Sequence, residues 1–292
     1  MDDLTRGLAI VEKPNPKRFT MPRCCQCVPN LSWFPIALGI VSCATFIGSY
    51  TIAVSLGHVE PYFPYISDTG TTSPESCIFG QFLNMSAFLS FVCVCIRYKL
   101  IAAFRDNLDR TSHILNKTSL VLGCISSLGL SIVANFQESN IEPVHLSGAS
   151  LVFVLGVGYM LTQASLSYKM YPSCNGILIA RIRLTVGIIG LISMTSAFIS
   201  AVISRELWSD NPPKDHTKIH WKPSDPGFEA HIVSTMSEWV MAFSFVLYFF
   251  TYIRDFQKMR LKVDMHLFVA HLDERPIFTG SHGPLETSSL LA

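Results

Sequence analysis

Charged residues are scarce in this sequence, and neither sign is in clear excess. Only 15% of the 292 residues are charged, whereas soluble domains have about 25%. Basic residues number 22 and acidic residues 21, so the large basic excess typical of nucleic-acid binding is missing. These shortages exclude a water-soluble globule and a nucleic-acid-binding protein.

Long apolar runs take the place of the missing charge. Six stretches are long enough to cross a hydrocarbon core, which takes about 20 residues of helix. A membrane barrel would show segments of about ten residues that alternate in polarity, and these stretches do not alternate. The sequence predicts an all-α, multispanning helix bundle with spans near 32–56, 78–98, 118–137, 146–168, 177–203 and 230–252.

The basic residues are divided unevenly between the two sides of this predicted bundle. Of the 22 basic residues, 18 fall on one side, and the other four are Arg205, Lys214, Lys218 and Lys222. Lysine and arginine are retained on the cytoplasmic side of a membrane. We therefore expect a cytosolic segment at 1–31, a transmembrane domain at 32–252 and a flexible cytosolic tail at 253–292, with both termini in the cytosol.

Cysteine is nearly absent from the predicted outer loops. Only Cys77 falls in one of them, so nothing there indicates a framework of disulfides. Cys24, Cys25 and Cys27 lie together just before the first span, where a zinc site would need a fourth ligand that the neighbourhood does not offer. S-palmitoylation of these three thiols fits better, with unmodified thiols as the alternative.

The first outer loop carries the most specific motif of the sequence. It contains the run Pro64-Tyr65-Ile66-Ser67-Asp68-Thr69-Gly70-Thr71, followed by Pro74 and Glu75. The Asp68 side chain favours a turn, Gly70 permits a positive φ angle, and the prolines restrict the flanks. We expect this loop to form a compact cap and not a floppy tether.

This run resembles the first luminal loop of the damage-regulated autophagy modulator (DRAM) family of six-helix membrane proteins. Further matches follow in the same order: Arg97-Tyr98, Asn135-Phe136-Gln137, Val144-His145, Gly148-Ala149, Gly227-Phe228, His231, Ser234 and Glu238-Trp239. The resemblance covers about residues 33–256. It implies a protein that promotes autophagy, and in some members cell death, from lysosomal or endosomal membranes.

The resemblance also bears on partners and chemistry. It implies partners in the autophagy machinery and no catalytic residues, and no cofactor is expected. Relatives in the wider superfamily are linked to GPI-anchor remodelling and to anchoring a phosphoinositide kinase complex at the plasma membrane. A lipid-handling or transport protein, or a plasma-membrane scaffold, is therefore the alternative to a non-enzymatic membrane adaptor.

The C-terminus carries a candidate sorting signal. Glu286 precedes Leu290 and Leu291 by the spacing of an acidic dileucine motif, which clathrin adaptors bind. The motif follows a glycine-, serine- and proline-containing tail that can extend to an adaptor. It predicts delivery to late endosomes or lysosomes, and the alternative is an unstructured apolar terminus.

A few polar residues lie at membrane depth or at its edge. An isolated carboxylate such as Glu238 costs a few kcal/mol inside a bilayer, so it needs a partner or a water-filled pocket. The functional interpretation is a lipid-headgroup or ion site near the outer leaflet, and the alternative is a structural hydrogen-bond network. The candidates are Asn84, Asn135, Gln163, His145, His231 and Glu238, with Asp68 of the loop able to converge on the last three.

Enzymatic motifs are missing. His231 and Glu238 are seven residues apart and share a helix face, but no second pair repeats the pattern that a metal-dependent hydrolase needs. The sequence contains neither a nucleophile elbow nor a Walker loop. We therefore expect no metal, no catalytic residue and no enzymatic activity, with membrane lipids among the partners.

Overall fold

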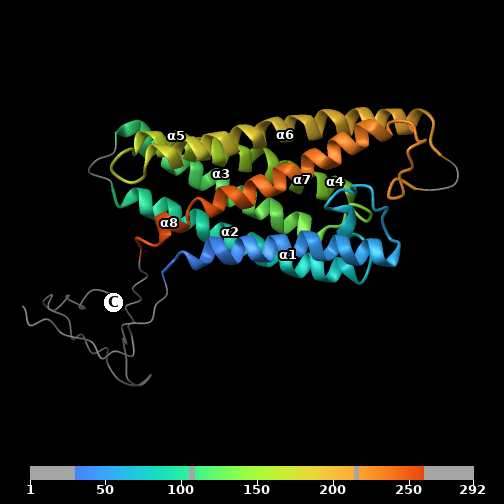
Figure 1. Ribbon diagram of the computed structural model, residues 1–292, viewed down its shortest axis with the longest axis horizontal. Helices are drawn as coiled ribbons and strands as arrows, with labels where there is room; N and C mark the ends of the chain where they lie inside the picture. Colours follow the sequence, from blue (N-terminus) through green and yellow to red (C-terminus); the bar gives the residue numbers. More distant parts are fainter. Residues whose placement is uncertain (1–29, 105–108, 214–216, 260–292) are drawn as a thin grey trace, which may run out of the picture. The chain divides into compact units, whose positions relative to one another are not determined.

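The fold is a bundle of helices, which the computed structural model describes for residues 30–104, 109–213 and 217–259 (Figure 1). The elements in chain order are α1 (Trp33–Leu56), the 3₁₀ turn η2 (Asp68–Gly70), α2 (Glu75–Ala102), α3 (Arg110–Asn135), α4 (Glu142–Ser150), the π-helical turn η4 (Leu151–Leu155), α5 (Gly156–Lys169), α6 (Ile177–Asp210), α7 (Phe228–Phe250) and α8 (Ile253–Phe256). The described residues contain no strand.

Six helical runs are long and apolar enough to span a membrane. Four of them are α1, α2, α3 and α6, and the other two are the continuous runs Glu142–Lys169, which joins α4, η4 and α5, and Phe228–Phe256, which joins α7 and α8. The predicted all-α fold with six spans is confirmed. The cytosolic placement of the termini stays a prediction.

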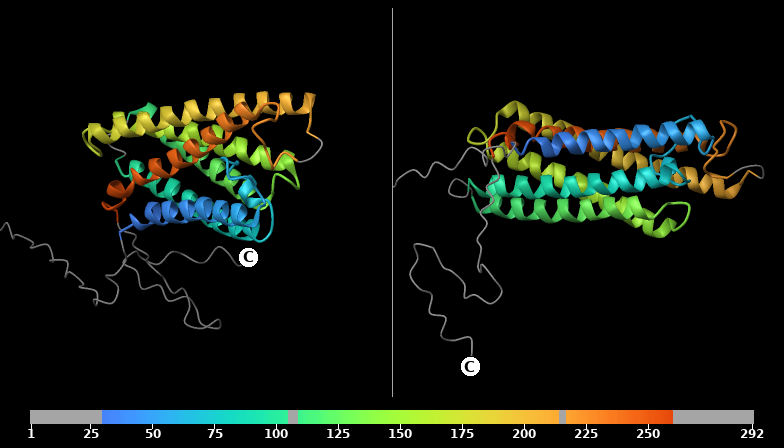
Figure 2. Two further views of the ribbon diagram at one scale, coloured as in Figure 1. Left: turned by 45° about the vertical axis from the view of Figure 1, so that its right-hand side comes forward. Right: turned by 90° about the horizontal axis from the view of Figure 1, so that it is seen from below.

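Spans that follow each other in sequence pack against each other. Contacts run from α1 to α2, from α2 to α3, from α3 to α4 and α5, from α5 to α6 and from α6 to α7, and α7 also contacts α1 (Figure 2). Consecutive spans of a membrane bundle cross it in opposite directions, so sequence neighbours pack as antiparallel pairs. The last span thereby closes the bundle onto the first.

The outward faces of the spans are apolar, whereas small polar residues lie between the helices. Ile40, Phe88 and Leu178 are each more than 60% exposed, as expected of side chains that face lipid. Buried serines join neighbouring helices, and Ser42 donates to Ser86 across α1 and α2 at 3.0 Å. Small polar residues at helix interfaces allow close packing and hydrogen bonding in a bilayer.

The helices extend beyond the apolar stretches from which they were predicted. α3 begins at Arg110 and not near residue 118, because the Asp109 side chain accepts a hydrogen bond from the Ser112 N–H at 2.9 Å and caps the helix. Hydrogen bonds from Ser112 and from Lys169, whose Nζ lies 3.1 Å from Asp109 Oδ2, lower the pKa of Asp109 to about 2. Hydropathy marks only the part of a helix within hydrocarbon, so a polar first turn escapes it.

The first residues of the segment expected to be a flexible tail are helical. Ile253–Phe256 forms the helix α8, in which Asp255 and Phe256 are buried against the bundle. A buried aspartate and a buried aromatic ring anchor this segment, although it follows the last apolar stretch. Residues 260–292 lie outside the described part of the chain.

Candidate functional site

The first outer loop is pinned to α7 by three consecutive residues. The Pro64 carbonyl accepts a hydrogen bond from the Trp239 indole at 2.9 Å, and the Tyr65 hydroxyl donates to Ser234 at 2.8 Å. The Ile66 N–H donates to Glu238 Oε2 at 3.0 Å. Residues about 170 positions apart in sequence thus hold the loop against the start of the last span.

Hydrogen bonds within the loop make it compact. Thr69 donates to the Ile66 carbonyl at 2.7 Å and its hydroxyl lies 2.8 Å from that of Ser49 on α1. Thr71 donates to the Asp68 carbonyl at 2.8 Å. We call residues 64–71 the luminal cap, a name that follows the predicted orientation.

Gly70 serves the cap for a different reason from the expected one. The glycines with positive φ among the described residues are Gly57 and Gly227, and Gly70 is not one of them. A Cβ on Gly70 would lie 2.4 Å from Cγ of Phe79. Space against the Phe79 ring, and not backbone conformation, requires a glycine here.

Glu75, the last residue of the motif, lies outside the luminal cap and pairs with His58. Its side chain is fully buried at the start of α2, and Oε1 lies 2.5 Å from His58 Nδ1. Glu75 thereby joins the two ends of the first outer loop.

A cavity of about 520 Å³ opens beneath the cap. Asp68, His145, His231 and Glu238 all line it, together with Tyr65. The structure therefore brings together the four residues whose convergence the sequence suggested. They come from the cap, α4 and α7.

Carboxylates crowd the inner wall of this cavity. Glu138 accepts a hydrogen bond from Ser67 at 3.1 Å and lies 3.8 Å from His145 Nε2, while His145 Nδ1 donates to the Phe136 carbonyl at 2.7 Å. Burial, followed by the charges of Glu138 and Glu238, raises the pKa of Asp68 well above its ordinary value of 3.8. The cap thus holds an aspartate that retains its proton more readily than an exposed one.

His231 differs from His145 in having no hydrogen-bond partner among the described residues. Its side chain is only 3% exposed. The ring stacks on Trp221, with centroids 4.3 Å apart, and meets Tyr65 edge-on at 5.1 Å. The polar atoms of His231 therefore have only the cavity to face.

The asparagines lie elsewhere. Asn84 donates to Asn135 Oδ1 at 3.0 Å, and Asn135 donates back to Asn84 Oδ1 at 3.1 Å. Ser131 donates to the same Asn84 oxygen at 2.7 Å. These residues join α2 to α3 and do not line the cavity, which favours the structural interpretation for them.

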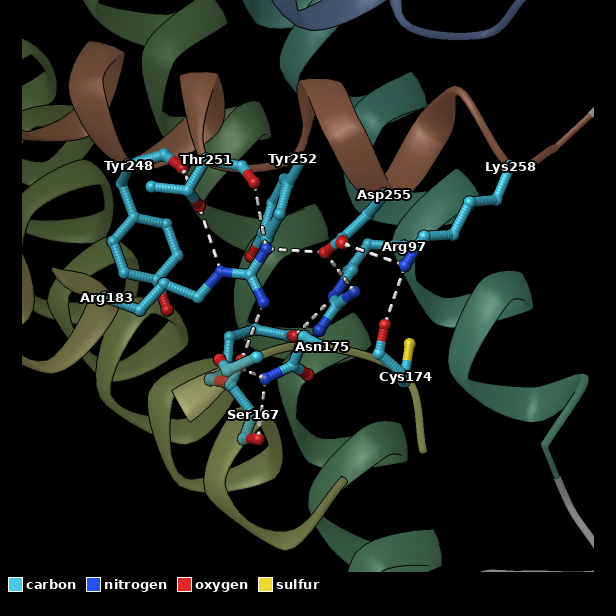
Figure 3. A network of polar contacts seen from close by, with 12 residues as sticks. Arg97, Ser167, Cys174, Asn175, Arg183, Tyr248, Thr251, Tyr252, Asp255 and Lys258 are labelled. Carbon is cyan, nitrogen blue, oxygen red and sulfur yellow. Dashed lines mark hydrogen bonds and ion pairs between the residues drawn. The ribbon is translucent and has the colours of Figure 1, made fainter. Parts of the chain in front are cut away.

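A second polar cluster, shown in Figure 3, lies at the opposite ends of the spans. Arg97 of α2 donates to Asp255 at 2.9 Å, and Arg183 of α6 donates to the same oxygen at 2.6 Å. Both guanidinium groups lie over the Tyr252 ring, 5.1 and 4.9 Å from its centroid. Gln163 completes the cluster by accepting from Arg97 at 3.0 Å. We call these five residues the arginine cluster.

Sequence reasoning missed the arginine cluster. It counted Arg97 and Arg183 among the basic residues, with Arg97 also in the family motif, and it named no acidic partner for either. It interpreted Gln163 as an amide at membrane depth that hydrogen-bonds between helices, but did not identify Arg97 as its partner. A usable signal was present, because an arginine at membrane depth requires an acidic partner and Asp255 is the acid that follows the last apolar stretch.

The remaining predicted sites lie outside the described residues. They are the palmitoylation candidates Cys24, Cys25 and Cys27 and the sorting residues Glu286, Leu290 and Leu291.

Comparison with known proteins identifies the family. The family model described as the Frag1/DRAM/Sfk1/Cwh43P N-terminal domain matches residues 30–259, which covers both polar clusters and all six spans. The chain belongs to this family. The resemblance to DRAM proteins that the loop motif indicated is thereby confirmed.

Relatives within the family share most of their length with this chain. Human DNA damage-regulated autophagy modulator protein 2 is 45% identical over 82% of this chain and 88% of its own length. Human DNA damage-regulated autophagy modulator protein 1 is 40% identical over 82% of this chain and 96% of its own. The Xenopus laevis protein named modulator of macroautophagy TMEM150B-A is 41% identical over 56% of this chain. No solved structure matches the chain.

Proposed function

We propose that this protein promotes autophagy from the membrane of lysosomes or late endosomes, as an adaptor that catalyses no reaction. The observation that carries the proposal is the extent of the similarity. Two human proteins named as autophagy modulators are 40 to 45% identical over 82% of the chain. Similarity that runs through all six spans and both polar clusters favours a shared role and not only a shared fold.

The cap supports the adaptor part of the proposal. Its hydrogen bonds to α7 hold it in one arrangement, and the preceding residues Tyr62 and Phe63 are 63% and 53% exposed. Exposed aromatic residues on a rigid support are typical of contact surfaces for protein partners or membranes. The cap would thus present such a surface in the lumen, while cytosolic segments engage the autophagy machinery.

Loss of the protein tests this role. In cells that lack the chain, we expect a lower autophagic flux, measured as the turnover of a lipidated autophagosome marker with and without a lysosomal inhibitor. Re-expression of the full chain should restore the flux, and the tagged protein should colocalise with a late endosomal or lysosomal marker. Unchanged flux after verified loss of the protein would refute the proposal.

A further inference from the structure

Two cavities adjoin beneath the luminal cap. The polar cavity described above shares Ser67, His145, Ala149, Phe153 and Glu238 with a second cavity of about 120 Å³. The second cavity continues between the spans to Val94, Tyr159 and Phe249 and is lined mainly by apolar side chains, with a few serines among them. We call the larger cavity the polar chamber and the smaller one the apolar cavity. The polar chamber opens into the apolar cavity at the level of Glu238.

The apolar cavity has the length of a lipid chain. Glu238 and Phe249 both line it from α7, and at 1.5 Å per residue they lie about 16 Å apart along the helix. One leaflet of hydrocarbon is about 15 Å deep. An empty apolar space of this kind forfeits dispersion contacts, and a methylene chain would restore them.

The polar chamber favours a positively charged group. Asp68, Glu138 and Glu238 line its inner wall, and Lys218 lines it as well. Arg205, the other basic residue of the lining, is paired with Glu142 at 2.8 Å. Three carboxyl groups therefore face one lysine that is not balanced by Glu142. A cation among them would offset the repulsion from Glu138 and Glu238 that helps Asp68 to retain its proton.

Two polar groups in the chamber still need partners. The buried His231 ring makes no hydrogen bond with any described residue, although it lines the chamber. Glu238 accepts the Ile66 N–H with Oε2 only, which leaves Oε1 without a partner among the described residues. Both residues line the chamber, so these atoms are free to bond to a ligand or to water within it.

The geometry favours an organic cation over a metal ion. In the described part of the chain, no three His, Cys, Asp or Glu side chains lie close enough to hold a metal ion. The ring of Tyr65, which also lines the chamber, instead provides an aromatic group beside which an ammonium group can pack.

We propose that the two cavities together bind one single-chain membrane lipid whose headgroup carries a protonated amine. The amine lies among Asp68, Glu138 and Glu238, a hydroxyl or amine N–H of the headgroup reaches His231, and the chain extends toward Phe249. This binding is independent of the proposed role in autophagy, because it is measured on the purified protein.

Photo-crosslinking to the purified full-length protein tests the proposal. The probe is a diazirine-bearing sphingoid base, which is a single-chain amino alcohol, and the reference is a diazirine fatty acid of equal chain length. We expect saturable labelling by the amine probe and at least about tenfold weaker labelling by the fatty acid, since the fatty acid lacks the charge-assisted hydrogen bond of the amine. Equal labelling by the two probes would overturn the proposal.

Two variants separate the chambers. Glu238→Gln keeps an oxygen for the Ile66 N–H but removes the charge, so the affinity for the amine probe should fall roughly tenfold. Ala149→Phe fills the junction between the chambers and should strongly reduce labelling by the amine probe. Val154→Phe is the matched control, because Val154 lies on the same helical run with 48% of its surface exposed.

The folded state of each variant is checked by its elution volume and melting temperature. If Glu238→Gln fails to fold, Ala149→Phe and its control still decide the outcome. Unchanged labelling in a folded Glu238→Gln, or equal loss in Ala149→Phe and Val154→Phe, would contradict the proposed site.

Discussion

Asp255 is the residue on which the arginine cluster depends. It lies between Arg97 and Arg183, and all three side chains are at most 5% exposed. Removing one partner of a buried ion pair costs about 3–5 kcal/mol, because a buried charge is left uncompensated. Here the loss of one carboxylate would leave two such charges.

Asp255→Asn should therefore destabilise the protein by at least about 3 kcal/mol. The measurement is the free energy of unfolding of the purified protein in detergent, with heat or a denaturant used to unfold it. Arg254→Gln removes a charge from the exposed neighbouring residue and serves as control. Equal stability of the two variants would show that the ion pairs do not hold α8 and α7 to the bundle.

Asp68 links the luminal cap to pH. Its pKa is raised above its ordinary 3.8 by burial and by Glu138 and Glu238, so the folded protein binds this proton more tightly than the unfolded chain does. The resulting stability is fully present below pH 3.8 and is lost as the pH rises through the folded-state pKa. The folded conformation of the luminal cap should thus be more stable in an acidic lumen than at neutral pH.

Limited proteolysis of the outer loops between pH about 4 and 8 measures this effect. We expect cleavage in the wild type to become faster as the pH rises, and the rise to be smaller in Asp68→Asn. His145, His231 and Lys218 face the same cavity in both proteins, so the difference between them isolates Asp68. Parallel pH profiles would contradict the assignment.

Among the elements, α3 and α4 approach each other through glycine. A Cβ on Gly129 of α3 would lie 2.8 Å from the Gly148 carbonyl oxygen and 3.0 Å from the Val152 nitrogen. Both are backbone atoms, which cannot move aside as a flexible side chain can. The helices must therefore separate if Gly129 is enlarged.

Gly129→Ala should destabilise the protein by about 1–3 kcal/mol, measured as the midpoint of unfolding in detergent. The matched control is Gly48→Ala on α1, where a Cβ would meet nothing within 4 Å. That change should be neutral or stabilise the helix by up to about 1 kcal/mol. A Gly129→Ala protein as stable as Gly48→Ala would show that the close approach is not required.

The elements could be predicted from the sequence, but many of their contacts could not. Apolar stretches indicated all six spans because hydrocarbon requires helices of that length. They did not indicate the first turn of α3 after Asp109 or the short helix α8, because polar and charged residues interrupt the apolar pattern in both segments. The exact ends of the helices depend on local capping side chains and on buried side chains that pack against other helices.

The residues of the candidate site were predicted in part, because the cost of a charge in hydrocarbon can be read from the sequence. Asp68 and Glu238 were expected to converge because a carboxylate at membrane depth requires a polar partner or a water-filled pocket. Both residues line one cavity. The bond between Arg97 and Asp255 joins residues 158 positions apart, and periodicity within a helix does not tell which helix it will face. Gly70 was recognised by its motif, but its contact with Phe79 is a property of packing.

For the whole molecule, the sorting motif is a proposal about location. Glu286, Leu290 and Leu291 lie outside the described residues, and their spacing fits an acidic dileucine. Replacing Leu290 and Leu291 by alanine should shift the tagged protein from late endosomes to the cell surface, measured by surface biotinylation. Replacing the neighbouring Ser288 and Ser289 by alanine is the control, and an equal surface fraction in both variants would discard the motif.

The side of the membrane on which the cap lies decides both the sorting and the ligand proposals. The described residues offer a reporter at each end of the spans, since Cys77 at the start of α2 and Gln257 after α8 are both exposed. One variant keeps Cys77 as its only cysteine, and a matched variant has Gln257→Cys as its only cysteine.

Labelling of these variants in sealed lysosomes with a membrane-impermeant maleimide is the most direct measurement. We predict that Gln257→Cys reacts in intact lysosomes, whereas Cys77 reacts only after the membrane is permeabilised. Labelling of Cys77 in intact lysosomes, with protection of Gln257→Cys, would place the cap in the cytosol and contradict the proposed orientation.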